Sequence, residues 1–87
     1  MKEKRISFSY KDPNARSVAV AGSFNDWSID ALPLRKKGKK WEASISLSPG
    51  RYEYRFVIDG IRWTDDPNAH EQCSNPFGES NSVLMVG

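Results

Sequence analysis

The sequence is poor in cysteine, in long apolar runs and in helical periodicity. Its single cysteine, Cys73, rules out an internal disulfide and a zinc site made of four thiolates. No stretch approaches the length needed to cross a membrane, and none resembles the apolar part of a signal peptide. We therefore expect a cytoplasmic protein that does not engage a membrane.

Excess charge of one sign is also lacking. The 87 residues carry 13 Lys and Arg against 11 Asp and Glu, a net charge of +2, so the overall balance demands neither a polyanionic partner nor disorder. The exception is a basic cluster around Gly38, formed by Arg35, Lys36, Lys37, Lys39 and Lys40. Such a cluster is either a solvated hairpin tip that protects a sheet edge or a phosphate-contacting loop. We favour the first interpretation and expect no nucleic-acid partner.

Motifs for catalysis are missing as well. Glycoside hydrolysis needs two carboxylates across a cleft, but most acidic residues here occupy predicted turns, and so small a domain has little depth to enclose a cleft. His70 and Cys73 fall in one predicted loop without a third residue to orient them. No metal-ligand spacing and no phosphate-binding glycine motif is present. We predict that the protein is not an enzyme, with no catalytic residue, no metal and no cofactor.

What the sequence does have is alternation of apolar and polar residues with a period of two. It predicts strands at residues 6–10, 17–21, 41–47, 52–58, 61–64 and 83–86, a short proline-interrupted edge segment at 32–34, and a long polar loop at 65–82. This pattern predicts one all-β domain over residues 1–87, an antiparallel β-sandwich of immunoglobulin-like shape with about six to eight short strands. A barrel of the OB type is the alternative.

The three tryptophans divide between core and surface. Trp41 is in phase with the apolar residues of its strand, which predicts that it is buried. Trp27 instead lies in a turn of Ser, Asn and Asp, and Trp63 follows the tight turn Asp59-Gly60. Flat aromatic rings beside hydrogen-bonding side chains suit a surface that binds sugars, because a pyranose has an apolar face and a rim of hydroxyls.

Arg55 is a candidate for such a hydrogen-bonding partner. It is out of phase with the apolar residues of its strand, so its side chain is predicted to point away from the core. An arginine beside a tryptophan-bearing hairpin can donate to sugar hydroxyls, whereas an outward arginine is ordinarily only solvated.

These features occur together, and in the same order, in one known family. The matching segments are Val-Ala-Val-Ala-Gly-Ser-Phe-Asn-Asp-Trp at 18–27, Trp-Glu at 41–42, Ser-Pro-Gly-Arg-Tyr-Glu-Tyr-Arg-Phe-Val-Ile-Asp-Gly at 48–60, Trp63, Asp-Pro at 66–67 and Asn-Ser-Val-Leu at 81–84. They resemble the glycogen-binding domain of the β subunit of AMP-activated protein kinase, in carbohydrate-binding module family 48. The amino-terminal domains of isoamylases and glycogen-branching enzymes are similar. The resemblance covers roughly residues 5–86.

The resemblance implies a fold, a ligand and site residues. The fold is an early-set immunoglobulin-like sandwich, and the ligands are α-1,4-linked glucans such as glycogen, starch and maltooligosaccharides. Trp27 and Trp63 correspond to the two stacking tryptophans, and Arg55 stands where the kinase family carries a hydrogen-bonding lysine. Asn81 matches an asparagine that contacts sugar hydroxyls. Phe77 takes the place of an apolar loop residue that reaches into the curve of the glucan.

Two functional hypotheses follow from the resemblance. The leading one is a non-catalytic module that binds α-glucans and targets a catalytic domain or a kinase subunit, in cis or in trans. The alternative is a structural or protein-interaction domain that has kept the fold and lost its affinity for sugar.

One departure from the family bears directly on the site. The hairpin after Asp59-Gly60 carries one extra residue before Trp63. Because successive strand residues face opposite sides of a sheet, a single insertion decides which side Trp63 faces unless the turn or a bulge absorbs it.

Overall fold

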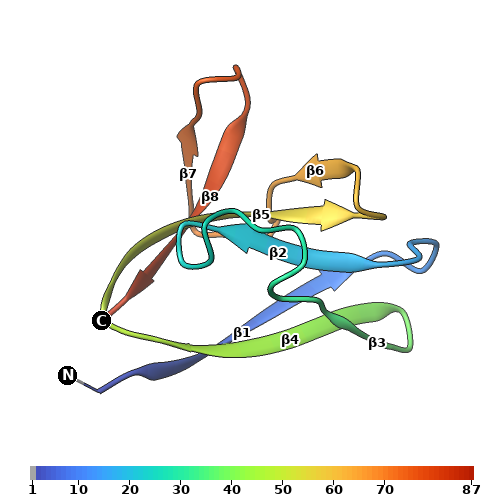
Figure 1. The fold of residues 1–87 in the computed structure, drawn as a ribbon, viewed down its shortest axis with the longest axis horizontal. Coiled ribbons are helices and arrows are strands. Elements are labelled where there is room, and N and C mark those ends of the chain that lie inside the picture. Colours follow the sequence, from blue (N-terminus) through green and yellow to red (C-terminus); the bar gives the residue numbers. More distant parts are fainter. Residues whose placement is uncertain (1) are drawn as a thin grey trace.

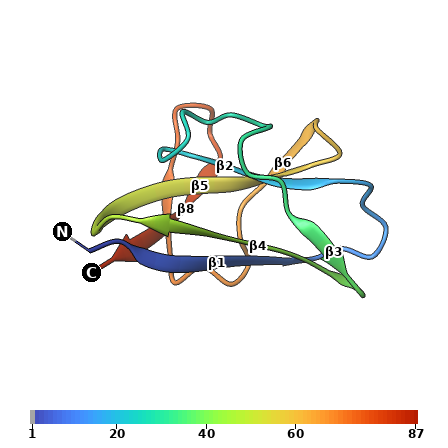
Figure 2. The same cartoon turned by 60° about the horizontal axis from the view of Figure 1, so that its bottom comes forward.

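The computed structural model, which describes residues 2–87, consists of strands in two layers (Figure 1). Along the chain they are β1 (Lys4–Lys11), β2 (Val18–Gly22), β3 (Arg35–Lys37), β4 (Lys40–Leu47), β5 (Gly50–Ile58), β6 (Arg62–Thr64), β7 (Glu71–Ser74) and β8 (Ser80–Val86). One sheet has the order β1-β4-β3, and the other has the order β2-β5-β8-β7 with β6 also paired to β5 (Figure 2). The predicted all-β, immunoglobulin-like sandwich is confirmed. No helix within residues 2–87 is long and apolar enough to cross a membrane.

Strand β5 organises the larger sheet because it is paired along both of its edges. On one edge, residues 54–58 pair with β2. The opposite edge is shared, since residues 50–54 pair with β8 and residues 56–58 pair with β6. Arg55 therefore stands at the point where this edge passes from β8 to β6.

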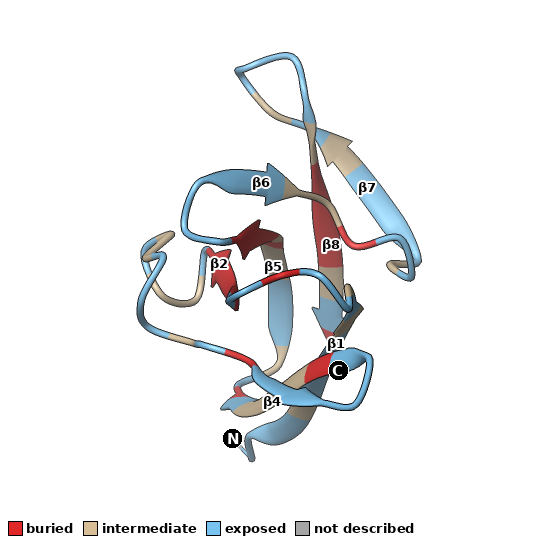
Figure 3. Cartoon of the chain, turned by 90° about the vertical axis from the view of Figure 1, so that its right-hand side faces the viewer, coloured by how far each residue is buried: buried red, intermediate tan, exposed pale blue. Residues whose placement is uncertain are grey.

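The core lies between the two sheets and is built from the alternating apolar residues. The almost completely buried apolar side chains on the inner face of the larger sheet are Val18, Val20, Phe56 and Ile58. From the smaller sheet, the ring of Phe8 meets that of Tyr54 edge-on, with 5.0 Å between the centroids. Burying one such side chain contributes about 1.5–3 kcal/mol. Figure 3 shows buried positions on β2, β5 and β8 and mostly exposed ones on β6 and β7.

The segment at 32–34 lies at the edge of the larger sheet, as its sequence predicts, and its pairing is interrupted at the proline. It joins the larger sheet only through an isolated bridge between Ala19 and Pro33. Two flanking backbone bonds, Val20 N–H to Leu32 O and Leu34 N–H to Val18 O, hold it in place. Proline has no N–H to extend a ladder, so the regular strand β3 begins only after it.

The prediction of one long loop at residues 65–82 is wrong. This stretch contains β7, and β8 already begins at Ser80. Strand β7 has the sequence Glu-Gln-Cys-Ser and pairs with β8 at the end of the sheet. An edge strand with so little apolar surface has no apolar alternation to reveal it, because backbone pairing and polar side-chain bonds hold it in place.

The connection between β6 and β7 is fixed to the core by a buried acid. The Asp66 carboxylate accepts hydrogen bonds from the Tyr54 hydroxyl at 2.6 Å and from the Asn68 N–H at 2.8 Å. The Asp66 N–H donates to Ser82 Oγ at 2.7 Å. Burial and this carboxylate raise the pKa of the Tyr54 phenol, which stays protonated as a donor.

Trp41 is buried, as predicted, and supports a first test. Its side chain is 7% exposed, its Nε1–H donates to Asp12 O at 3.0 Å, and the Lys36 ammonium lies 6.0 Å from the ring centroid. We expect Trp41→Ala to lower the free energy of unfolding by about 3–5 kcal/mol, measured by urea denaturation. Trp41→Phe, which keeps a buried ring and loses the hydrogen bond, should lose clearly less. Equal losses in the two variants would contradict this account.

Candidate functional site

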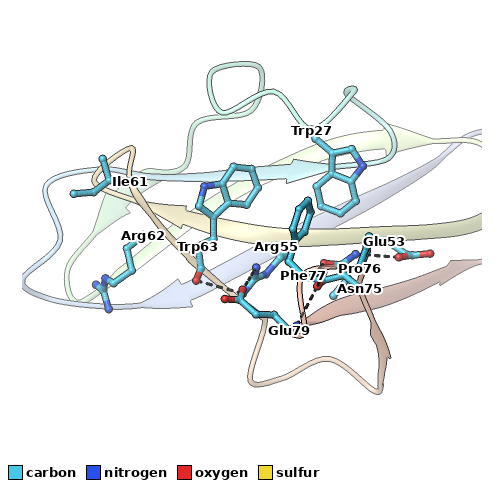
Figure 4. A pocket seen from close by; sticks show the side chains of 11 residues that line it. Trp27, Glu53, Arg55, Ile61, Arg62, Trp63, Asn75, Pro76, Phe77 and Glu79 are labelled. Carbon is cyan, nitrogen blue, oxygen red and sulfur yellow. Dashed lines mark hydrogen bonds and ion pairs between the residues drawn. The ribbon is translucent and has the colours of Figure 1, made fainter.

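A hollow of about 900 Å³ opens on the outer face of the larger sheet (Figure 4). All five residues named from the sequence line it, namely Trp27, Arg55, Trp63, Phe77 and Asn81. They come from the β2–β3 connection, from β5, from β6, from the β7–β8 turn and from β8. The other lining residues are Glu53, Ile61, Arg62, Asn75, Pro76 and Glu79. The structure thus brings the predicted residues together, and their role as a binding site stays a prediction.

The turn that carries Trp27 has an uncommon backbone conformation. Asp26 and Trp27 both have positive φ angles, of 56° and 59°. A bulky residue in this left-handed region costs of the order of 1–2 kcal/mol. The Asn25 side chain holds the turn, because its Oδ1 accepts from Gly22 N–H at 3.0 Å and its Nδ2–H donates to Val20 O at 3.0 Å. A strained residue held in this way is often functional.

The same turn is tied to β5 and to the core. Ser23 exchanges two hydrogen bonds with Glu53, from N–H to O at 2.9 Å and from Glu53 N–H to Ser23 Oγ at 3.1 Å. Phe24 points inward, with its ring stacked 5.9 Å from that of Phe8. A Cβ at Gly22 would lie only 2.6 Å from the Phe24 ring, so only glycine lets the chain pass here. Anchored on both sides, the turn leaves the Trp27 indole over the hollow.

The extra residue in the next hairpin is absorbed by the turn. Ile58 pairs with Arg62, which leaves a three-residue loop in which Asp59 and Gly60 both have positive φ. Trp63 consequently pairs with Val57 and faces the same side as Arg55. With a two-residue loop, Trp63 would stand opposite the inward-facing Phe56. The insertion therefore accompanies an outward Trp63, which is 37% exposed.

A second asparagine shapes the turn that carries Phe77. Asn75 Oδ1 accepts from Phe77 N–H at 3.0 Å and from Glu79 N–H at 3.1 Å. Gly78 takes a positive φ of 78° within the turn. Phe77 is 86% exposed, and in the view of Figure 4 its ring stands between the two indoles. The three aromatic side chains thus lie on one face.

Arg55 connects the two sides of the hollow. Its guanidinium donates to Glu79 Oε1 at 2.5 Å and to the Trp63 carbonyl at 3.3 Å. The Arg55 side chain is 13% exposed, against 57% for that of Glu79. A largely covered arginine therefore holds a carboxylate that stays accessible.

Glu53 and Asn81 form the floor on the other side of Arg55. Glu53 Oε1 accepts from Asn81 Nδ2–H at 3.0 Å and from the Cys73 thiol at 3.2 Å, while Arg51 binds Oε2 at 2.8 Å. The bonds from Asn81, Arg51 and Cys73 lower the pKa of Glu53 from 4.5 to about 2. Burial raises the pKa of the Cys73 thiol, so it remains a donor. Asn81 also accepts from Asn75 Nδ2–H at 3.2 Å and is 8% exposed.

Sequence reasoning did not identify four residues that shape this hollow: Asn25, Glu53, Asn75 and Glu79. The two asparagines had a signal, because asparagine in a predicted turn commonly bonds to the backbone two or three residues away. The two glutamates had a weaker one. Glu53 shares the outward parity of Arg55, but the position of Glu79 depends on a turn within the stretch predicted to be a loop.

Comparison with known proteins places the chain in a family. The family described as the glycogen recognition site of AMP-activated protein kinase matches residues 5–87. The chain belongs to this family. Among family relatives, 5'-AMP-activated protein kinase subunit beta-1 of Sus scrofa is 34% identical over 71 residues, which cover 82% of this chain and 55% of the relative. The Bos taurus subunit beta-1 is 35% identical over 71 residues, with 82% and 25% covered.

Similarity extends to a plant protein and to an enzyme structure. Protein FLOURY ENDOSPERM 6, chloroplastic, of Oryza sativa subsp. japonica is 33% identical over 72 residues, covering 83% of this chain and 13% of that protein. A crystal structure of maltogenic amylase from S. marinus superposes with a TM-score of 0.81 and 22% identity, covering 98% of this chain and 14% of the amylase. The amylase shows a shared fold. The chain spans 55% or less of the length of each of these proteins.

The lowered pKa of Glu53 predicts a specific pH dependence of stability. A carboxylate whose pKa is lower in the folded state stabilises the fold above its unfolded value, near 4.5, and loses that effect as pH falls to about 2. The stability difference between the unmodified chain and Glu53→Gln should therefore be largest above pH 5 and shrink between pH 4.5 and 2. Urea midpoints measured across this range test it. Glu71→Gln, which alters an exposed carboxylate on β7, is the control, and a difference for Glu53→Gln that does not vary with pH would contradict the prediction.

Proposed function

We propose that this chain is a non-catalytic module that binds α-1,4-glucans such as glycogen, starch and maltooligosaccharides. The observation that carries the proposal is the hollow on the larger sheet, where Trp27, Trp63 and Phe77 surround accessible polar groups. Membership of a glycogen-recognition family supports the choice of glucan. The pyranose faces would stack on Trp27 and Trp63. The polar groups would fix the position of the glucan along the site.

The polar groups of the hollow match the chemistry of sugar hydroxyls. A hydroxyl both donates and accepts, whereas a guanidinium only donates and a carboxylate only accepts. The pair of Arg55 and Glu79 offers both functions at one place. Asn81 is largely buried with both ends of its amide engaged, so we assign it chiefly to holding Glu53 and Asn75.

Phe77 is suited to recognising the curved shape of a glucan. It stands exposed on a turn that Asn75 and Gly78 define. An α-1,4-linked glucan curves, and an apolar side chain between two stacking platforms would occupy the inside of that curve. A straight glucan would have no concave side for Phe77 to occupy, so the arrangement favours curved glucans.

The Glu53 carboxylate supports binding rather than hydrolysis. A general acid needs a raised pKa so that it is protonated near neutral pH. The pKa of Glu53 is lowered to about 2, so this carboxylate does not have the environment of a proton donor.

The proposed module would act as part of a larger assembly. Its relatives are longer proteins, and those from pig and cow are named as subunits of AMP-activated protein kinase. We propose that a catalytic domain or kinase subunit, in cis or in trans, is brought to glucan by this chain. Affinity should be weak, because an open site buries little ligand and exchanges one set of hydrogen bonds for another.

Titration with maltoheptaose tests the proposal. Millimolar maltoheptaose should change the tryptophan fluorescence of the unmodified chain. Trp27→Gly should weaken binding at least about tenfold, because it removes a stacking platform. The variant should still fold, since glycine relieves the left-handed conformation. Ile29→Ala is the matched control, because Ile29 is exposed in the same connection and does not line the hollow.

The outcome separates the proposal from the alternative of a structural or interaction domain. A folded chain that gives no fluorescence or NMR response to millimolar maltoheptaose would support that alternative. Equal loss of affinity in Trp27→Gly and Ile29→Ala would overturn the stacking role of Trp27.

Glu79 allows a finer test of how hydroxyls are recognised. Glu79→Ala removes the accessible acceptor and should weaken maltoheptaose binding by about threefold to tenfold. Glu71→Ala removes an exposed carboxylate of β7 outside the hollow and should bind as the unmodified chain does. Tighter binding by Glu79→Ala would contradict this role, since it would mean that Glu79 competes with sugar for Arg55.

A further inference from the structure

The smaller sheet forms the other layer of the sandwich (Figure 2), and its outer face lies on the opposite side from the hollow. This face is strongly basic. Its cations are Arg5, Lys11, Arg35, Lys37 and Lys40, all exposed, and its single acid is Glu42. Together they have a formal charge of +4, whereas the whole chain carries only +2. The basic charge is therefore concentrated on this face, which we call the basic face.

Strand pairing, rather than the sequence cluster alone, assembles the basic face. Lys11 pairs with Lys40 and Lys40 pairs with Lys37, which places three lysines in a row across the three strands. Glu42 forms an ion pair with Lys37, with 3.8 Å between Lys37 Nζ and Glu42 Oε1, and it is also the cross-strand partner of Arg35. Lys36 belongs to the opposite face, over the Trp41 ring. Strand pairing thus places Arg35, Lys37 and Lys40 on the outer face and Lys36 on the inner one. It also brings Lys11, which is distant in sequence, onto the outer face.

The space between the cations is filled by small polar side chains. These are Ser7, Ser9, Ser44 and Ser46, and Arg5 Nε–H donates to Ser44 Oγ at 3.2 Å. Aromatic side chains on these strands, such as Tyr10 and Trp41, face the core instead. The strands of the basic face therefore turn no aromatic ring outward on which a nucleic-acid base could stack. The apolar side chains at its margin are those of Leu32 and Pro33, from the segment before β3.

Strand β1 also has an unused edge. It stands at the end of the order β1-β4-β3, so one of its edges pairs with no strand in the part of the chain that the structure describes. The edge is eight residues long. Its free backbone groups can be satisfied by another polypeptide strand, which a nucleic acid or a lipid headgroup cannot replace.

We propose that the basic face and the free edge of β1 together bind an acidic polypeptide segment in extended conformation. The segment pairs with β1 through its backbone. Every second side chain then lies over the basic face, because strand side chains alternate. Acidic residues at alternate positions meet Arg5 and the lysine row that begins at Lys11. Since the hollow is on the other sheet, glucan and acidic segment bind at the same time, and this proposal does not rest on the proposed function.

Synthetic peptides test both the charge and the alternation. The probe is an eight-residue capped peptide in which Glu and Thr alternate, and the matched peptide has four Glu followed by four Thr. We expect the alternating peptide to bind the 87-residue chain at low salt, at least about fivefold more tightly than the block peptide, and more weakly as salt rises. NMR amide exchange should slow at residues of β1.

Two neighbouring lysines provide matched variants. Lys40→Ser removes the middle of the lysine row and should weaken peptide binding about threefold or more. Lys39→Ser removes the same charge from the adjacent turn and should have a smaller effect. Both variants should respond to maltoheptaose as the unmodified chain does, so a failure here is distinct from a failure of glucan binding.

Several results would overturn the proposal. One is that the alternating peptide does not bind, or binds no better than the block peptide. Another is that oligothymidylate of equal charge, or vesicles containing anionic lipid, bind as well as the alternating peptide, since this would indicate a general attraction for anions. A third is that the slowed amides lie outside β1 and its neighbours.

Discussion

The alternation of side chains along β5 is the constraint on which the rest of the molecule depends. Tyr54, Phe56 and Ile58 face inward and form much of the core. Between them, Glu53 and Arg55 face outward into the hollow. Because strand geometry fixes this alternation, the residues that stabilise the sandwich also position the polar floor of the site. Any shift of β5 by one residue would exchange the two sets and destroy both.

The aromatic platforms depend on turns that are ordered before a ligand arrives. Asn25 holds the turn of Trp27, Asn75 holds the turn of Phe77, and a three-residue loop holds Trp63. Each turn contains residues with positive φ. Gly60 and Gly78 adopt it without strain, whereas at Asp26, Trp27 and Asp59 part of the folding free energy is spent on local strain. For the proposed glucan site, such ordered turns would leave little conformational entropy to be lost on binding.

The two faces of the sandwich differ in their electrostatics. The charged residues that line the hollow are all ion-paired. Arg55 pairs with Glu79 inside it, whereas Glu53 and Arg62 pair with residues outside it, Arg51 and Asp12. Such a surface suits a neutral, hydroxyl-rich ligand, because no net charge has to be desolvated. The outer face of β1, β4 and β3 has an excess of cations with a single carboxylate among them. One small domain therefore offers two chemically different surfaces, separated by its core.

Much of this architecture was predictable from residue patterns, and the failures have identifiable causes. Period-two alternation predicted β1, β2, β4, β5 and the burial of Trp41, although in the structure β2 is buried on both of its faces. Strand β7 was missed because an edge strand with polar residues carries no such pattern. The segment at 32–34 was correctly predicted as an interrupted edge segment, because Pro33 has no N–H with which to extend the pairing.

The site divides in a similar way. The sequence by itself determined which side chains are available for the proposed stacking and hydrogen bonding, since parity and turn composition already set Trp27 and Arg55 apart from the core. Only the tertiary structure decided that Trp63 faces the same side, because that depends on how three residues close a hairpin. The tertiary structure also decided that Glu79 pairs with Arg55 and that Lys11 lies beside Lys40. Contacts between residues far apart in sequence arise from strand register, which local patterns do not specify.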